Sequence, residues 1–359
     1  MQATTQRKFA YAVVIGRFQP VHFGHQRLIE EALRAAQRVV VVVGSDRQPR
    51  SVRNPFTFDE RERMVRACLR GSEQMRVSVV GVSDSPYNDQ LWIASIQSAV
   101  DRLVAQDGAD PARTAIALVG HLKDASSYYL RLFPKWEFVP HEVVESIHAT
   151  DVRQLYFDPE RRGQVPAEAL PEGTAGFLAG FAGTADYAAL CEERAFLADY
   201  REKYRYAGSS FPPIFTTVDA VVVEAGHILL VQRRFQPGRG TWALPGGFVG
   251  QHERLLDAAI RELKEETRLK VPAPVLQGSV KGSHVFDAPE RSQRGRTLTH
   301  GFFFELAHNQ WAGLSPVRAN DDAAQARWVP ISEFLGMQAQ MYEDHFFIAN
   351  HFLGGLGPR

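Results

Sequence analysis

The sequence predicts an α/β protein with two domains, and three observations support this prediction. Strand patterns alternate with helical patterns from Phe9 to about Trp136, which is typical of a parallel sheet covered by helices on both faces. A stretch rich in Gly, Ser and Pro at 207–213 ends this alternation, and strand patterns then follow one another directly. With 359 residues, the chain also exceeds the length that one hydrophobic core usually serves.

The first half contains four apolar runs with the pattern of buried parallel strands, at 11–15, 38–44, 77–82 and 114–120. Thr57 and Glu60 have the spacing of a capping box at the start of a helix. Gly16, Gly44 and Gly120 stand where three of the strands end. Ligands of such folds gather at the carboxyl ends of the strands, so we expect one nucleotide cleft at this edge.

The second half begins after a helical pattern at 187–205 and the linker. Two adjacent strands are predicted at 217–224 and 227–233, joined by a short turn with a glycine. We therefore expect a first domain at 1–185, a helical connector and linker at 186–211, and a second domain at 212–359.

Composition and charge exclude several classes of function. Lys plus Arg and Asp plus Glu number 41 each, so no basic field indicates a nucleic-acid partner. No stretch is apolar enough to span a membrane, and the first residues lack a signal-peptide pattern. Cys68 and Cys191 are far apart and lack metal-ligand spacing, which favours the cytoplasm. Whether the chain forms a homo-oligomer stays open.

Residues 16–25 read Gly-Arg-Phe-Gln-Pro-Val-His-Phe-Gly-His and lie between the first strand and the first helix. The first N–H groups of a helix have no partner within it and the helix dipole is positive there, so this turn suits an anion. His22, His25 and Arg17 suit a polyphosphate in particular. A pair of partly buried histidines that cap a turn is the alternative, but the position after the first strand favours a functional site.

A second motif lies at 147–153, where Thr150 is predicted to cap a helix and Arg153 to point at the same site as His22 and His25. An ordinary N-cap with a surface arginine is the alternative interpretation. Together the two motifs resemble the nucleotidyltransferase superfamily that carries His-x-Gly-His and Ser-Thr-x-x-Arg-like signatures. His148 departs from that pattern, because the family usually has serine there.

Further segments at 54–57, 60–61, 87–92 and 120–130 resemble nicotinamide-mononucleotide (NMN) adenylyltransferases, especially those fused to a C-terminal Nudix domain. The resemblance covers residues 9 to about 185. It implies a Rossmann-like parallel sheet and the transfer of AMP from ATP to NMN, which gives NAD and pyrophosphate. Mg²⁺ would bridge the phosphates, with few protein ligands.

The resemblance also implies roles for individual residues. His22 and His25 would hold the phosphates of ATP and stabilise the transition state. Arg17 and Arg153 would hold the outer phosphates. Trp92 would stack on the nicotinamide ring, although a lone tryptophan in a helix is more often part of the core. Lys123 and Asp124 would reach ribose or phosphate, with a surface ion pair as the alternative. The expected substrate-binding residues are Gly16, Arg17, Phe18, Trp92, Gly120, Lys123, Asp124 and Thr150.

The sharpest signal lies in the second half. Glu262, Glu265 and Glu266 are spaced i, i+3 and i+4, so a helix places their carboxylates on one face. Such packed like charges repel one another, and a divalent cation with hard oxygen ligands, Mg²⁺ or Mn²⁺, resolves the repulsion. A solvated acidic helix face is the alternative, which Gly247, Glu253 and Arg261 in register argue against.

These residues resemble the Nudix box at every defined position except one, because Arg268 replaces a glycine that ends the helix. The resemblance implies an α/β/α Nudix domain in which Glu262 and Glu266 are the main metal ligands, Glu265 assists, and Arg261 pairs with Glu253. Arg268 should cost about 1 kcal/mol at the helix end without removing a ligand. The fusion to the first domain points to ADP-ribose as the hydrolysed substrate, with Glu266 catalytic.

Two rival functions stay open. The first domain could transfer AMP to another phosphorylated acceptor, which Trp92 and the residues at 126–129 argue against. The Nudix domain could be a ligand sensor that does not hydrolyse, which the intact glutamates argue against. A DNA-binding regulator is the least favoured alternative, because no basic helix-turn-helix is apparent.

Overall fold

The computed structural model describes residues 7–122, 129–141, 148–158, 160–161, 163–165, 170–204, 212–307 and 313–354. The chain divides into two compact units, Met1–Cys191 and Glu192–Arg359. The division falls within helix α7 (Ala185–Lys203), inside the stretch expected to connect the domains. Each unit is described by itself.

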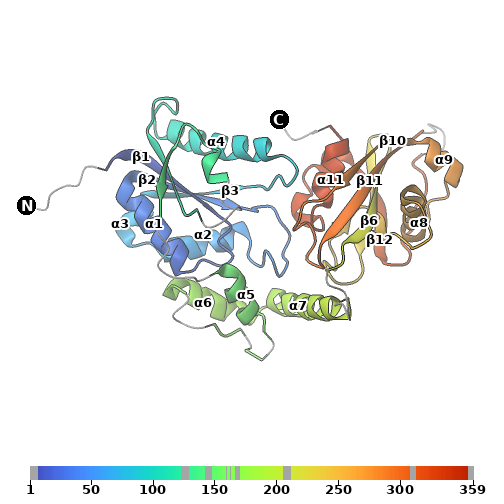
Figure 1. The fold of residues 1–359 in the computed structure, drawn as a ribbon, viewed down its shortest axis with the longest axis horizontal. Coiled ribbons are helices and arrows are strands. Elements are labelled where there is room, and N and C mark those ends of the chain that lie inside the picture. The colour runs from blue at the N-terminus through green and yellow to red at the C-terminus, as the bar shows by residue number, and fades with distance from the viewer. Residues whose placement is uncertain are drawn as a thin grey trace, which may run out of the picture. The chain divides into compact units, whose positions relative to one another are not determined.

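The first unit is built on a parallel sheet in the order β3-β2-β1-β4-β5 (Figure 1). Its strands are β1 (Phe9–Gly16), β2 (Ala36–Gly44), β3 (Val77–Val82), β4 (Ile116–Gly120) and β5 (Glu137–Pro140). The parallel α/β architecture is as predicted, with β5 added at one edge. The strand order reverses between β1 and β4, so the carboxyl end of β1 is where a ligand is expected.

Helices cover both faces of this sheet, because the strands are apolar on both sides. Ala12 and Val14 of β1 pack into one core, and Tyr11 and Val13 pack into the other. The helices are α1 (Phe23–Ala35), α2 (Phe58–Ala67), α3 (Gly71–Gln74), α4 (Asp89–Gln106), α5 (Ala149–Tyr156) and α6 (Glu172–Phe181). The predicted capping box of α2 is confirmed, since the Thr57 side chain accepts from the Glu60 N–H and the Glu60 carboxylate accepts from the Thr57 N–H.

The second unit has a mixed sheet in the order β10-β11-β6-β7-β12, with β9 paired to β6 and β8 paired to β7. β6 and β11 are parallel, and the other pairs are antiparallel. The strands are β6 (Phe215–Glu224), β7 (His227–Arg233), β8 (Trp242–Ala243), β9 (Gly246–Phe248), β10 (Val280–Phe286), β11 (Thr297–Leu306) and β12 (Ala323–Pro330).

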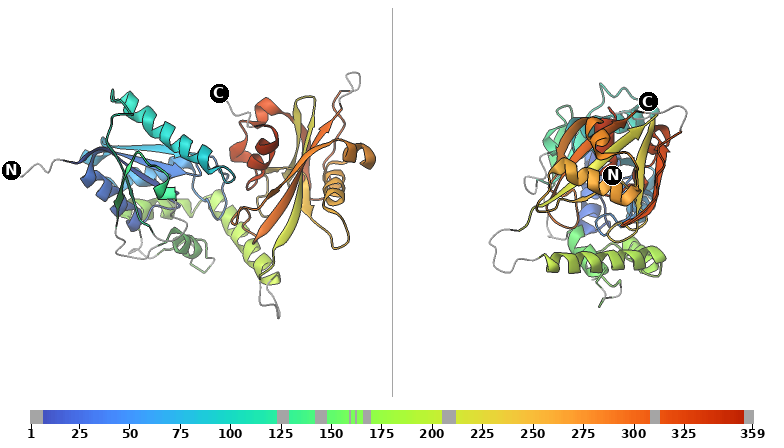
Figure 2. Two further views of the ribbon diagram at one scale, coloured as in Figure 1. Left: turned by 45° about the horizontal axis from the view of Figure 1, so that its top comes forward. Right: turned by 90° about the vertical axis from the view of Figure 1, so that its right-hand side faces the viewer.

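The helices of the second unit are α8 (Leu255–Thr267), α9 (Ala273–Gly278), α10 (Ile331–Phe334), a 3₁₀ turn (Gln338–Gln340) and α11 (His345–Phe352). Figure 2 shows α8 and α11 on opposite faces of the sheet. Val218, Ala220 and Val222 of β6 face the core beneath α8, so Asp219 between them faces α11. This layering is the α/β/α arrangement that the sequence predicted.

No helix in the described parts of the chain combines the length and the apolar character needed to cross a bilayer.

Two candidate active sites

The first candidate site is the turn between β1 and α1. His22 is the N-cap of α1, and its Nδ1 accepts a hydrogen bond from the Gly24 N–H at 3.1 Å. The Nδ1 atom of His25 accepts from the His22 N–H at 3.3 Å, and the two ring centroids are 3.8 Å apart. The helix start therefore fixes both imidazoles side by side.

Burial sets the charge of the two rings, and these hydrogen bonds set which ring nitrogen carries the proton. Burial lowers the pKa of His22 to about 4, with a smaller contribution from His148. Burial also lowers the pKa of His25, and His22 adds to the effect. Both rings are thus neutral at pH 7, and because Nδ1 accepts from the backbone, the proton of each ring sits on Nε2. The pair offers two Nε2–H donors to a ligand.

Guanidinium groups gather around the same turn. Arg153 of α5 donates from Nη1 to the Gln19 carbonyl at 2.6 Å and from Nη2 to the Thr150 hydroxyl at 3.2 Å. The pKa of Arg153 falls to about 10, first through burial and then through the positive charges of Arg17 and Arg53. The mutual repulsion of these three cations is what an anionic ligand would relieve.

The helix that carries Arg153 starts earlier than predicted. The N-cap of α5 is His148, without a capping side chain, and Thr150 lies inside the helix. The expectation that Thr150 caps the helix is therefore wrong. Its hydroxyl instead accepts from Arg153, a spacing of three residues that places both side chains on one face.

A buried arginine from the segment 60–61 shapes the turn, in a role that the resemblance did not specify. Arg61 of α2 is 1% exposed and donates to the carbonyls of Arg17, Gly44 and Ser45, so it ties the end of β1 to the end of β2. Phe18 is also 1% exposed and has a φ of 53°, a left-handed conformation that this packing holds in place.

The other predicted residues of this site have different surroundings. A side chain at Gly16 would meet the Phe18 ring at 3.1 Å, and one at Gly120 would meet the end of the Leu130 side chain at 2.9 Å, so a larger residue at either position would require that neighbour to shift. Trp92 of α4 is partly buried against the core between this helix and the sheet, and its ring lies edge to face with Tyr129 at 5.6 Å between centroids. Lys123 and Asp124 lie outside the described residues.

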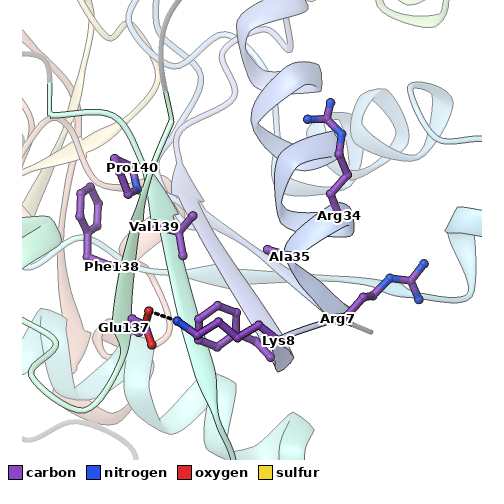
Figure 3. Close-up of a pocket in the computed structure, with 9 residues that line it drawn as sticks. Arg7, Lys8, Arg34, Ala35, Glu137, Phe138, Val139 and Pro140 are labelled. Carbon is purple, nitrogen blue, oxygen red and sulfur yellow. Dashed lines mark hydrogen bonds and ion pairs between the residues drawn. The ribbon is translucent and has the colours of Figure 1, made fainter. Parts of the chain in front are cut away.

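A cavity of about 460 Å³ lies in the same unit but away from this turn. Figure 3 shows it between β5, the start of β1 and the end of α1, with Arg7 and Arg34 at its rim. Lys8 pairs with Glu137 across it. The histidines at the carboxyl end of β1 do not line this cavity, which reaches β1 only at its amino-terminal end.

The second candidate site is the acidic face of α8. The Glu266 carboxylate is 8% exposed and accepts from the Gly246 N–H at 3.1 Å. Burial raises the pKa of Glu266 to about 8. A side chain at Gly247 would meet the Glu262 carboxylate at 2.4 Å. Glycine at this position of β9 therefore lets the helix press its carboxylates against the strand.

Arg261 organises the remaining carboxylates. It donates to both oxygens of Glu253, at 3.0 and 2.7 Å, and to single oxygens of Glu262 at 2.8 Å and Glu265 at 2.9 Å. Its Nη2 also donates to the Phe248 carbonyl at 3.1 Å. The hydrogen bonds from Arg261 lower the pKa of Glu253 to about 2. One guanidinium thus joins the helix, the loop before it and β9.

The chemistry of this donor set fits a hard divalent cation, because three carboxylates lie on one helical face. Among the described residues, however, no three His, Cys, Asp or Glu side chains are arranged to hold a metal ion. Arg261 engages Glu262 and Glu265 in ion pairs instead. Binding a cation therefore requires these two carboxylates to turn away from Arg261.

Helix α8 ends at Arg268, where the sequence predicted its end. Arg268 is the C-cap, with φ 51° and ψ 25°, the left-handed conformation that glycine adopts without a Cβ penalty. Its N–H donates to the Lys264 carbonyl at 3.0 Å, so the helix ends in the ordinary way at the cost of backbone strain.

Comparison with known proteins assigns each half of the chain to a known family. Residues 13–155 match the cytidylyltransferase-like family, and residues 214–349 match the NUDIX domain family. A nicotinamide/nicotinic acid mononucleotide adenylyltransferase from Acinetobacter baylyi is 37% identical over 204 residues, which are 56% of this chain and 97% of the relative. An ADP-ribose pyrophosphatase from Methanocaldococcus jannaschii is 32% identical over 115 residues, which are 32% of this chain and 61% of that relative.

A solved structure matches nearly the whole chain. It is a bifunctional NMN adenylyltransferase/ADP-ribose pyrophosphatase from Francisella tularensis, in complex with AMP and a manganese ion. It has 33% sequence identity and a TM-score of 0.88, over 97% of this chain and 100% of the solved one. Fold and sites thus define a nucleotidyltransferase domain followed by a Nudix domain. The chain belongs to the family of bifunctional NMN adenylyltransferases/ADP-ribose pyrophosphatases.

Proposed function

We propose that the first unit transfers AMP from ATP to NMN, giving NAD and pyrophosphate, and that the second unit hydrolyses ADP-ribose. The observation that carries the first activity is the pair of neutral imidazoles, His22 and His25, fixed at the start of α1. The named activities of the relatives support both assignments. Cys68 and Cys191 are not joined in a disulfide, which suits the cytoplasm as the place of action.

In the transfer reaction, the 5′-phosphate of the mononucleotide attacks the α-phosphorus of ATP. The Nε2–H groups of His22 and His25 donate to phosphate oxygens, where charge develops in the transition state. Arg17 and Arg153 hold the outer phosphates, whose negative charge grows as pyrophosphate leaves. The donors are fixed by the helix start before the substrate binds, so little reorganisation is required. Trp92 positions the nicotinamide ring.

In the hydrolase, Glu262 and Glu266 are the residues that would hold Mg²⁺ or Mn²⁺, with Glu265 assisting. A cation held there would polarise the diphosphate as a Lewis acid and would activate a water. The chain itself orients the carboxylates: Gly246 donates to Glu266, and the Glu253–Arg261 pair fixes the helix against β9. Diphosphate cleavage then gives AMP and ribose 5-phosphate.

A product assay tests both halves. Purified full-length protein with Mg²⁺ is given ATP with NMN, or with nicotinate mononucleotide, and separately ADP-ribose. We expect a pyridine dinucleotide with one pyrophosphate per turnover, and AMP with ribose 5-phosphate. Transfer to other phosphorylated acceptors but not to a mononucleotide would favour the rival transferase. ADP-ribose that binds with Mg²⁺ or Mn²⁺ but stays intact would favour a sensor.

A further inference from the structure

An aromatic surface lies directly beside the acidic face of α8. Phe248 follows Gly247 in β9, and its carbonyl accepts from Arg261, the residue that gathers the carboxylates. The Phe248 ring is 40% exposed. Because side chains alternate along a strand, the Phe248 ring projects away from Glu262, which the Gly247 position faces. A large exposed ring thus stands one residue from the candidate metal site.

Three more rings extend this surface. Phe215 of β6 lies 5.9 Å from Phe248 between ring centroids. Tyr204 lies 5.5 Å from Phe215 and Tyr200 lies 6.0 Å from it, and the two tyrosines are 4.6 Å apart. We call Tyr200, Tyr204, Phe215 and Phe248 the aromatic surface. Tyr200 and Tyr204 belong to the last turn of α7 and the residue after it, outside the segment 214–349 that matches the Nudix family.

The end of α7 is fixed to this unit by polar contacts as well. Arg201 donates to the Gln293 carbonyl at 2.7 Å, and Arg239 pairs with Glu192 at 2.7 Å. The first contact holds the end of α7 against the loop that precedes β11, and the second joins the middle of α7 to the loop between β7 and β8. The position of Tyr204 beside Phe215 is therefore set by the fold of the second unit itself.

The same loop brings a cation to the aromatic surface. The Arg294 guanidinium lies 5.2 Å from the centre of the Phe248 ring. It is also close enough to Tyr200 for its charge to lower the pKa of that phenol, against a larger rise from burial. The Tyr200 hydroxyl is buried and has no hydrogen-bond partner within the described part of the chain. Exposed rings, a guanidinium and an unsatisfied hydroxyl together suit an aromatic ligand with polar edges and a phosphate.

We propose that Tyr204, Phe248 and Arg294 bind the adenosine half of the diphosphate substrate, with the base on the rings and Arg294 near the phosphate. The connector helix α7 is thereby part of the hydrolase site. The proposal rests on the hydrolase function proposed above. Base stacking on aromatic side chains tolerates different bases, so these residues strengthen binding of a purine nucleotide rather than select one atom pattern.

Inhibition by the two products tests which half of the substrate the surface binds. In the full-length chain, Tyr204→Ala and Phe248→Ala should each raise the KM for ADP-ribose about tenfold, with little change in kcat. The inhibition constant of AMP against hydrolysis should rise by a similar factor, and that of ribose 5-phosphate should stay unchanged. An equal rise for both products, or no rise for AMP, would overturn the proposal.

Two controls accompany these variants. Tyr204→Phe keeps the ring, so its KM for ADP-ribose should rise much less than that of Tyr204→Ala. Val275→Ala removes a side chain of α9 that is 56% exposed in the same unit, and it should leave both constants unchanged.

A binding measurement separates this proposal from the hydrolase function. ADP-ribose is titrated calorimetrically into Glu266→Gln protein, with and without Tyr204→Ala. Weaker binding of ADP-ribose to the double variant would support the proposed role of the aromatic surface. Failure of the parent protein to hydrolyse ADP-ribose would contradict the hydrolase function but not this role. Equal binding in both proteins overturns the surface.

Discussion

The backbone N–H of His22 donates to Nδ1 of His25 at 3.3 Å, so one imidazole is oriented by the residue that carries the other. Each ring keeps its Nε2–H for a ligand, because its Nδ1 is already engaged with a backbone N–H. The pair is therefore built as one unit from the first turn of α1.

Replacing one member of this pair should stop synthesis alone. His22→Asn keeps a favourable N-cap, so the helix should form, but it removes the Nε2–H donor. We expect NAD formation to fall by about 10²-fold or more, with ADP-ribose hydrolysis unchanged. Parallel product assays check this. Loss of both activities in folded protein would contradict two independent sites.

In the second unit, we expect one substitution to stop hydrolysis without affecting synthesis. Glu266→Gln has nearly the same shape and can still accept from the Gly246 N–H, but it lacks the negative charge for a cation. Hydrolysis of ADP-ribose should fall by at least about 10- to 100-fold while NAD synthesis continues. Circular dichroism and the synthesis rate serve as controls for folding. Hydrolysis at the parent rate would show that Glu266 is not a metal ligand.

Acid should destabilise the second unit through His345. Its Nδ1 accepts from the Leu244 N–H at 3.1 Å, and burial lowers its pKa to about 3. The unfolded chain has the ordinary histidine pKa of about 6.5, so it binds the extra proton as the pH falls between these values. This histidine therefore contributes stability above pH 6.5 that is lost towards pH 3, at about 1.4 kcal/mol per pH unit.

Urea unfolding between pH 4 and 7 measures that contribution. His345→Gln can keep the hydrogen bond to Leu244 without a titrating ring. Its stability should fall less steeply with acid than that of the parent protein, by about one proton in the slope. Identical slopes for the two proteins would show that another group is responsible.

Arg268 offers a gain in stability. Its φ of 51° is unfavourable for any residue with a Cβ atom and free for glycine. Arg268→Gly should therefore raise the free energy of unfolding by about 1 kcal/mol, whereas Arg268→Ala should bring no such gain. Denaturant titration of both variants checks this. A glycine variant no more stable than the alanine variant would contradict the strain.

The sequence predicted the elements with strong patterns. The parallel strands of the first sheet were recognisable because they are long apolar runs, buried on both faces. β5 (Glu137–Pro140) was not predicted, because it is a short and partly exposed edge strand. α6 was not predicted, because its three glycines weaken the helical pattern. Burial of Leu178 and Phe181 stabilises this helix in the fold.

The sites show a similar division. Motifs with a fixed spacing, such as His22 with His25 or the three glutamates of α8, are recognisable because one local element positions all their members. Arg53 reaches the first site across the fold, so spacing gives no signal for it. Arg61 lies in one of the segments that carry the resemblance, but its hydrogen bond to the Arg17 carbonyl depends on the packing of α2 and not on spacing. The ion pairs that Arg261 makes with two glutamates depend on side-chain packing, which the Nudix box pattern does not encode.

The most direct measurement is a crystal structure of the full-length protein with ATP. We expect the triphosphate beside residues 16–25, with phosphate oxygens within hydrogen-bond distance of Nε2 of His22 and His25 and close to Arg153. A triphosphate bound elsewhere, with both imidazoles turned away from it, would contradict the central claim.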